Sequence, residues 1–101
     1  IKFFYITCPK KKEAHKIARY LVKNKLVACA NIIHNVDSVF TWKGKVTKAK
    51  EILIIGKTMN KNVQKIIKNV KKLHSYKVPC VIFFDIKNGN TDFLKWIIKS
   101  V

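Results

Sequence analysis

The sequence predicts an α+β protein of the ferredoxin-like, split βαβ type, in the order β-α-β-β-α-β with an added C-terminal helix. Two segments repeat apolar residues at helical period, and four runs are rich in β-branched and aromatic residues. The second and third of these runs are joined by a two-residue turn, which predicts a long β-hairpin. At 101 residues the chain has the length of one domain, which we place at 1–101.

The first strand and the first helix are predicted directly by the residue pattern. Residues 2–7 (KFFYIT) form a continuous apolar run, typical of a central strand covered on both faces. Pro9 then stands at a helix-start position, and the helix is expected to end near Asn24. Its apolar residues follow one face of a helix: Ala14, Ile17, Ala18, Leu21 and Val22.

The predicted hairpin is unusually long for a chain of this size. Residues 26–42 read as one strand, interrupted around residues 34–37, and a Lys-Gly turn at 43–44 leads into a return strand that ends at residues 51–58. Such a strand would extend roughly 55 Å if unbent, whereas a compact domain of this size has a radius of gyration of about 13 Å. The distal hairpin should therefore expose strand edges and apolar groups, which predicts a homo-oligomer. The apolar groups are Val39, Phe40, Trp42 and Val46.

The second half of the chain predicts the remaining elements. Asn60 is expected to cap a second helix. Its apolar stripe again has helical period and consists of Val63, Ile66, Ile67, Val70 and Leu73. Residues 78–86 predict a fourth strand, and residues 87–90 a turn. Asn90 then begins a short third helix over residues 91–100, with Asp92 in its first turn.

The net charge of +17 leaves two interpretations of the surface open. Clustered cations bind phosphates by releasing counterions, so a basic module that binds nucleic acid or another polyanion is one alternative. However, Arg19 is the only arginine among 22 basic residues, and the lysines are spread over every segment. Bidentate recognition of bases and phosphates favours arginine. We therefore expect a solvated basic surface and do not expect nucleic acid as a partner. No apolar run approaches the ~18 residues of a membrane span.

The cysteine pattern indicates a reducing compartment. Cys8, Cys29 and Cys80 are odd in number and contain no CxxC pair, which fits neither a disulfide framework nor a structural zinc knuckle. We expect a cytoplasmic or organellar protein. The sequence opens at Ile1 directly in a predicted strand, as if trimmed, so an upstream targeting segment would not be visible.

Six collinear motifs resemble one known family over the whole chain. They are TCP, LVACANII, FTWKGK, IGKT, HSYKVP and GNTDFLKW, and together they resemble the CutA-type divalent-cation tolerance proteins. This resemblance implies a ferredoxin-like subunit in a homotrimer, with sheet edges paired between subunits and interface clefts like those of PII signalling proteins. It further implies copper or another divalent cation as the bound metal, a PII-like signalling or homeostasis role, and no established catalytic reaction.

The resemblance also extends to individual positions. The residues that match the family's usual pattern are Cys29, Trp42, Gly44, Glu51, Lys57, His74, Tyr76 and Pro79. Cys80 stands where members commonly have a glutamate, and lysines replace acidic residues around the hairpin turn. Some bacterial members have a copper site formed by a cysteine and two adjacent histidines. Only His74 survives of that set, because the other two positions hold Ile6 and Leu73.

The candidate metal ligands are His74, Cys80 and Cys8. Thiolates and an imidazole suit copper(I), and His74 and Cys80 are six residues apart. Cys8, at the end of the first strand, is the candidate third ligand. The alternatives are a hydrogen-bonding role for His74 at a helix C-terminus and simple packing for Cys80. Cys8 also lies at a helix start near three lysines, which predicts a stabilised, reactive thiolate.

A ligand cleft is predicted at the subunit interface. Trp42, Lys57 and Tyr76 are candidates to line it and to accept a small anionic ligand, and we place Cys29 with them. The alternative for all four is packing. No nucleophile–base–acid set, paired carboxylates or phosphate loop can be assembled from five acidic residues, so an enzyme is not expected.

Overall fold

The computed structural model describes residues 1–101 and contains four strands, three α-helices and one short 3₁₀ turn. In chain order these are β1 (Lys2–Cys8), α1 (Lys11–Lys23), β2 (Cys29–Trp42), β3 (Lys45–Thr58), η1 (Asn60–Asn62), α2 (Val63–Leu73), β4 (Val81–Asp85) and α3 (Thr91–Ser100). The predicted ferredoxin-like order with an added C-terminal helix is confirmed. No helix has the length and apolar composition needed to span a bilayer.

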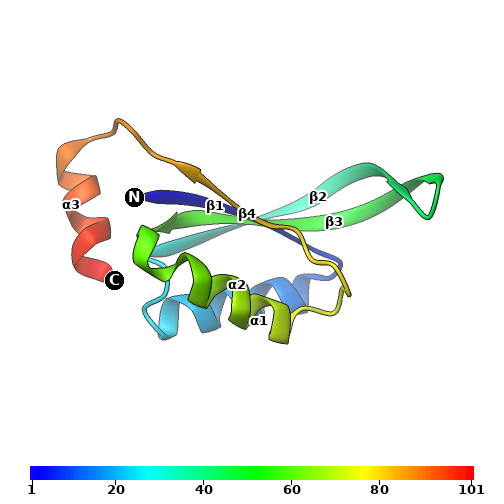
Figure 1. Cartoon of the computed structure of the whole chain (residues 1–101), viewed down its shortest axis with the longest axis horizontal. Coiled ribbons are helices and arrows are strands. Elements are labelled where there is room, and N and C mark those ends of the chain that lie inside the picture. The colour runs from blue at the N-terminus through cyan, green and yellow to red at the C-terminus, as the bar shows by residue number, and fades with distance from the viewer.

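The four strands form one antiparallel sheet in the order β2-β3-β1-β4. Helices α1 and α2 lie side by side against one face, and α3 lies beyond the sheet near the N-terminus (Figure 1). The predicted central position of β1 is confirmed. Its predicted cover on both faces is not present in the single chain, because neither α1 nor α2 crosses to the other face.

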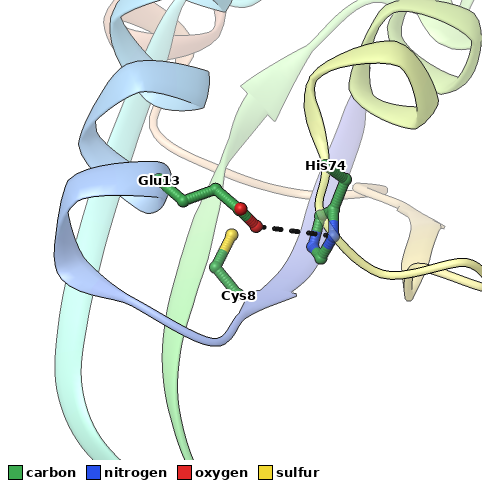
Figure 2. A group of neighbouring side chains, drawn as sticks. All are labelled: Cys8, Glu13 and His74. Carbon is green, nitrogen blue, oxygen red and sulfur yellow. Dashed lines mark ion pairs between the residues drawn. The ribbon is translucent and has the colours of Figure 1, made fainter.

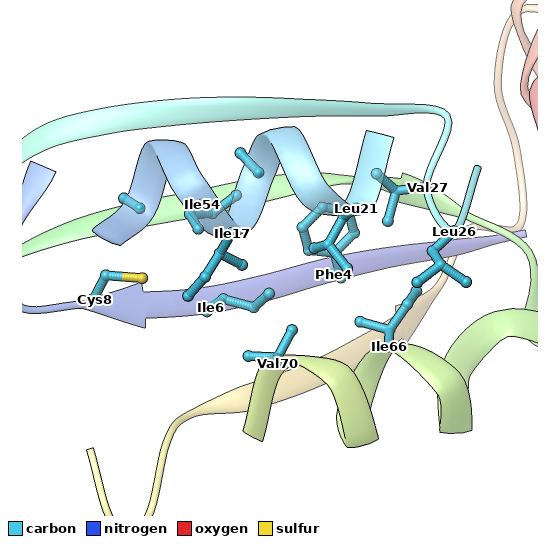
Figure 3. Close-up of a cluster of buried hydrophobic side chains, with 12 residues drawn as sticks. Phe4, Ile6, Cys8, Ile17, Leu21, Leu26, Val27, Ile54, Ile66 and Val70 are labelled. Carbon is cyan, nitrogen blue, oxygen red and sulfur yellow. The ribbon is translucent and has the colours of Figure 1, made fainter. Parts of the chain in front are cut away.

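The core fills the space between the sheet and its two helices (Figure 3). Successive side chains of a strand point to opposite faces, so β1 directs Phe4, Ile6 and Cys8 toward the helices, and all three are fully buried. They pack with the apolar stripes of α1 and α2, which include Ile17, Leu21, Ile66 and Val70. The intervening residues of β1, among them Thr7, therefore face the opposite side of the sheet. This alternation places the side chains of β1 in two separate candidate sites.

The hairpin of β2 and β3 projects away from the core, as predicted (Figure 1). The molecule is 44 Å long but only 22 to 25 Å across. Val39 is 64% and Val46 78% exposed near the tip. The predicted interruption is a β-bulge between Ile33 and Val36, where Asn35 adopts a positive φ of 60°. The predicted exposure of apolar groups on the distal hairpin is confirmed.

Three predicted boundaries differ from the structure. Strand β2 begins at Cys29, because the amides of Leu26 and Val27 both donate to the carbonyl of Leu21 and end α1 instead. Strand β4 covers only Val81–Asp85, so residues 78–80 lie outside it. The predicted cap at Asn60 is wrong, since η1 precedes α2 and neither has a side-chain cap.

Candidate metal centre and the adjacent cleft

Three elements meet at one end of the helical layer and bring three potential ligands together. Cys8 ends β1, Glu13 lies in the first turn of α1, and His74 is the C-cap residue of α2. One ligand atom from each side chain lies within 4.8 Å of the other two. Figure 2 shows the Glu13 carboxylate pointing between the Cys8 sulfur and the His74 ring. The two-residue connection between β1 and α1 places Cys8 and Glu13 on the same side.

His74 is held by two hydrogen bonds that fix its tautomer. Its side chain is fully buried. The carbonyl oxygen of Thr7 lies 2.7 Å from Nε2 and can only accept, so Nε2 carries the proton. The backbone N–H of Tyr76 donates to Nδ1 over 3.0 Å, so Nδ1 presents its lone pair. Both contacts are satisfied by a neutral imidazole protonated on Nε2.

The Glu13 carboxylate lacks a hydrogen-bond partner where it faces this histidine. Its Oε2 atom is buried, accepts no hydrogen bond and lies 3.5 Å from Nδ1 of His74. The contact drawn dashed in Figure 2 would be an ion pair only with a proton on Nδ1. The Tyr76 amide already occupies that nitrogen. A buried acceptor without a donor costs about 1 to 3 kcal/mol, and more when charged, so Oε2 is suited to a cation.

Cys8 is a protonated thiol in this environment. Burial, followed by the negative charges of Glu13 and Glu51, raises its pKa from 9.0 to about 12. The prediction of a stabilised and reactive thiolate at Cys8 is therefore wrong. The three lysines at positions 10–12 are exposed to solvent, while the sulfur points into the core, so burial outweighs the helix terminus.

These three side chains fit a divalent cation of intermediate softness. A thiolate, a carboxylate oxygen and an imidazole nitrogen are all ligands that zinc and related ions accept. The hydrogen bond from Nε2–H to the Thr7 carbonyl resembles the outer contact that orients ligating histidines, so that Nδ1 is the nitrogen that would coordinate, in place of its hydrogen bond from the Tyr76 amide. Loading would require the Cys8 thiol to lose its proton, as metal-bound cysteines do.

A cleft of about 780 Å³ lies on the other side of β1. It is lined by 14 residues of β1, β2, β3 and the segment before β4: Tyr5, Thr7, Val36, Asp37, Ser38, Val39, Phe40, Trp42, Thr47, Glu51, Tyr76, Lys77, Val78 and Cys80. The Tyr76 hydroxyl donates to Oε2 of the buried Glu51 over 2.8 Å. Burial and this hydrogen bond to a carboxylate raise the pKa of Tyr76 to about 12.

Cys80 lines this cleft and is not a member of the three-residue group. Its neighbours are Thr7, whose side-chain hydrogen bond lowers the thiol pKa, and Glu51. Burial and the Glu51 charge raise that pKa more, so the net shift is upward. Of the predicted ligands, His74 and Cys8 converge, whereas Cys80 lies with the residues on the opposite face of β1. The third member of the group is Glu13.

The four residues predicted to line a ligand cleft divide into two pairs. Trp42 and Tyr76 line the cleft described above. Cys29 and Lys57 are opposite each other where β2 begins and β3 ends, and the Lys57 ammonium lies 5.8 Å from the ring centre of Phe93 in α3. Cys29 and Trp42 are the two ends of the 14-residue strand β2, which separates them by roughly 40 Å. One chain therefore does not bring the pairs together.

The charges of the cleft differ from those that a small anionic ligand needs. Asp37 and Glu51 contribute two carboxyl groups to the lining and Lys77 one ammonium group. Asp37 is also paired with Lys50 at 2.9 Å, and both side chains are largely exposed. The net positive charge of the chain is thus not concentrated in this cleft.

Glu13 is the site residue that the sequence reasoning did not select. The signal for it was available, because Glu13 precedes the buried Ile17 of α1 by four residues and so shares its face. Glutamates are common in a first helical turn because they interact favourably with the helix dipole. That role alone explains Glu13 in the sequence, so its role as a candidate ligand was not predicted. The convergence with His74 depends on the packing of α2 beside α1.

The amino-acid sequence matches the family described as CutA1 divalent ion tolerance protein over residues 2–100. The divalent-cation tolerance protein CutA of Archaeoglobus fulgidus is 40% identical over 99 residues, covering 98% of this chain and 96% of that protein. A CutA homolog of Xenopus laevis is 41% identical over 93 residues, covering 92% of this chain. This chain spans 62% of the frog protein, and 54% of the similar chloroplastic CutA 1 of Oryza sativa.

Solved structures agree with this assignment. CutA1 from Oryza sativa superposes with a TM-score of 0.95 at 37% identity, covering 98% of this chain and 91% of that one. The periplasmic divalent cation tolerance protein CutA from Archaeoglobus fulgidus superposes with a TM-score of 0.94 at 39% identity, covering 98% and 96%. One relative is described as chloroplastic and another as periplasmic, so the compartment differs among relatives. By sequence and by fold, this chain belongs to the CutA1 divalent ion tolerance family.

Proposed function

We propose that this protein serves in divalent-cation tolerance by binding one cation per chain between Cys8, Glu13 and His74. The observation that carries the proposal is the Glu13 Oε2 atom, which is buried without a partner inside a group that also offers a sulfur and a nitrogen ligand. A bound cation would supply the partner that Oε2 lacks. Membership of a divalent ion tolerance family supports this use of the site.

The ligand types favour zinc or a similar divalent ion over copper(I). The site expected from the sequence, with two cysteines and a histidine, would have suited copper(I), but Cys80 does not join it. One sulfur, one oxygen and one nitrogen form a mixed set that suits divalent ions of borderline softness. Because Cys8 must give up a proton that its surroundings hold strongly, binding should strengthen as the pH rises.

We further propose that the chain assembles as a homotrimer through its sheet edges and its projecting hairpin. Strands β2 and β4 are the edges, and exposed apolar side chains also lie on β4, where Ile82 is 45% and Phe84 50% exposed. In such an assembly Cys29 and Lys57 of one subunit would reach the cleft beside Trp42 and Tyr76 of another. The clefts would then bind a small ligand, in a PII-like signalling or homeostasis role without catalysis.

We place this role in a reducing compartment, cytoplasmic or organellar. All three cysteines are free thiols, which agrees with a reducing environment. Metal binding through Cys8 needs the same condition, because an oxidised sulfur would not bind the cation.

Titration with zinc and cobalt(II) tests the metal site. The wild type should bind one ion per chain, and cobalt should show a thiolate charge-transfer band. Cys8→Ser, Glu13→Gln and His74→Gln should each weaken binding at least about tenfold, the equivalent of 1.4 kcal/mol. Cys80→Ser is the matched control, since it removes the same thiol outside the group, and it should bind normally. Full affinity in Cys8→Ser, or an equal loss in Cys80→Ser, would contradict the proposed site.

A further inference from the structure

Tyr76 touches both the candidate metal centre and the cleft. Its backbone N–H donates to Nδ1 of His74 over 3.0 Å, and its hydroxyl donates to Oε2 of Glu51 over 2.8 Å. Its ring also packs on the His74 ring, with centroids 4.9 Å apart. Glu51 and Tyr76 both line the cleft. One residue therefore connects two sites that lie on opposite faces of β1.

The Nδ1 atom of His74 can serve only one of two partners. The Nε2 atom is committed to the Thr7 carbonyl, so Nδ1 carries the only lone pair of the ring that faces the group. In the structure the Tyr76 amide occupies this lone pair. A cation that also contacts Glu13 Oε2, 3.5 Å from Nδ1, would need the same lone pair.

We propose that cation binding and the shape of the cleft are linked through competition for this lone pair. The inference rests on the proposed metal site and assigns it a means of regulation. When a cation takes Nδ1, the Tyr76 amide is released, and the start of segment 76–80 moves away from His74. Because the hydroxyl of Tyr76 is carried by the same residue, its hydrogen bond to Glu51 weakens and the wall of the cleft changes.

The segment around Tyr76 has few constraints that would prevent such a movement. Residues 74–80 form no helix or strand, and Val78 is 70% exposed. The other end of the segment is fixed where β4 pairs with β1 from Val81. Besides the packing of the Tyr76 ring on His74 and the Thr7 contact of Cys80, the two hydrogen bonds of Tyr76 hold the start of the segment to the His74 side and to the Glu51 side.

The linkage predicts a reciprocal effect on metal affinity. If cation binding strains the Tyr76–Glu51 contact, removing that contact must favour the cation by the same free energy. Tyr76→Phe keeps the amide and removes the hydroxyl, and it should bind zinc up to about tenfold more tightly, since a hydrogen bond to a charged group is of that order. Tyr20→Phe is the matched control. Its hydroxyl bonds Asn69 between α1 and α2, two turns along α1 from Glu13, and its zinc affinity should not change.

Amide hydrogen exchange on the intact protein, with zinc chloride as the only added ligand, tests the inference directly. Zinc should speed exchange at the Tyr76 amide in wild type and leave it unchanged in Cys8→Ser. If wild type binds no zinc, the proposed metal site fails. If zinc binds to Cys8, Glu13 and His74 while Tyr76 exchange is unchanged and Tyr76→Phe has wild-type affinity, the metal site stands and the linkage is refuted.

Discussion

His74 and Thr7 are joined by a hydrogen bond of 2.7 Å between the buried Nε2–H group and the main-chain carbonyl. This bond attaches the C-terminal end of α2 to the last residues of the central strand. It also sets which nitrogen of the imidazole faces Glu13. A single contact therefore supports the packing of the helical layer and the chemistry of the candidate metal centre.

Replacing His74 should destabilise the fold even without metal. His74→Ala leaves the Thr7 carbonyl and the Tyr76 amide without their partners and opens a cavity, so the free energy of unfolding should fall by about 2 to 4 kcal/mol. Urea denaturation at fixed protein concentration and with a chelator present measures this loss. The exposed His34 is the control, and His34→Ala should change stability by less than about 0.5 kcal/mol. Equal effects of the two substitutions would show that the buried contact contributes little.

Glu13→Gln should separate metal-dependent stability from metal-free stability. In the wild type, zinc at about 100 times its dissociation constant should stabilise the folded state by about 2.7 kcal/mol, and a chelator should remove this gain. In Glu13→Gln, where binding is at least about tenfold weaker, the gain at the same zinc concentration should fall to about 1.4 kcal/mol or less. The chelated variant should unfold at the wild-type temperature or above it, because the substitution removes a buried charge that lacks a partner. Thermal melts with and without zinc provide the measurement. A metal-free variant that unfolds well below the wild-type temperature would contradict the inference that the Glu13 carboxylate lacks a partner.

Cys80 should respond to alkaline pH. Burial and the nearby Glu51 raise the pKa of its thiol above 9.0, so the folded state holds the proton more tightly than the unfolded chain does. The resulting stability is complete below pH 9.0 and is lost as the pH rises through the folded-state pKa. Alkylation of Cys80, followed by mass spectrometry of its peptide, should reach half its maximal rate above pH 9.0.

Cys80→Ser provides the control for this alkaline effect. It should flatten the decline of the free energy of unfolding above pH 9.0, since the serine hydroxyl does not titrate there. An alkylation midpoint at or below that of a free cysteine would show that Cys80 is not shielded in the folded protein.

Gly56 should not tolerate a side chain. It pairs with Phe4 across β1 and β3, and an added Cβ would lie 2.1 Å from the Cys29 carbonyl oxygen and 2.5 Å from the Phe4 ring. The obstacle includes backbone, so it cannot move aside cheaply. Gly56→Ala should cost about 3 kcal/mol or more, measured by denaturation or as loss of folded protein. Gly44→Ala is a useful comparison, because open space surrounds that turn position and only its positive φ of 77° is strained.

Assembly can be tested by light scattering behind size exclusion. A homotrimer should have three times the chain mass of 11.7 kDa. Introducing a charge at the hairpin, as in Val39→Asp, should shift the mass toward that of the single chain, because Val39 is 64% exposed in isolation and would be buried by a partner. A wild-type mass near 12 kDa at micromolar concentration would refute the proposed trimer.

The residue pattern alone determined the order of elements, the long hairpin and the interruption in its first strand. Those features depend on local signals: apolar period, turn residues and the positions of proline and glycine. The predicted bounds and caps of the elements were wrong where tertiary contacts override local preferences. Leu26 and Val27 look like strand residues, yet their amides end α1, and Asn62 bonds the Leu26 carbonyl instead of capping α2.

The candidate site depended on the tertiary structure to a greater degree. The sequence supplied Cys8 and His74 as ligands, but 66 positions separate them, and only the packing of α1 and α2 on one face shows that Glu13 lies with them. Cys80 is close to His74 in sequence, which is why it was predicted to be a ligand. In the structure it lies beside Thr7, and strand alternation directs Thr7 to the face of β1 opposite to Cys8. The thiol of Cys8 illustrates why local sequence signals do not predict the chemistry of this site. Its helix-start position is local and favours the thiolate, whereas its burial is tertiary and raises its pKa to about 12.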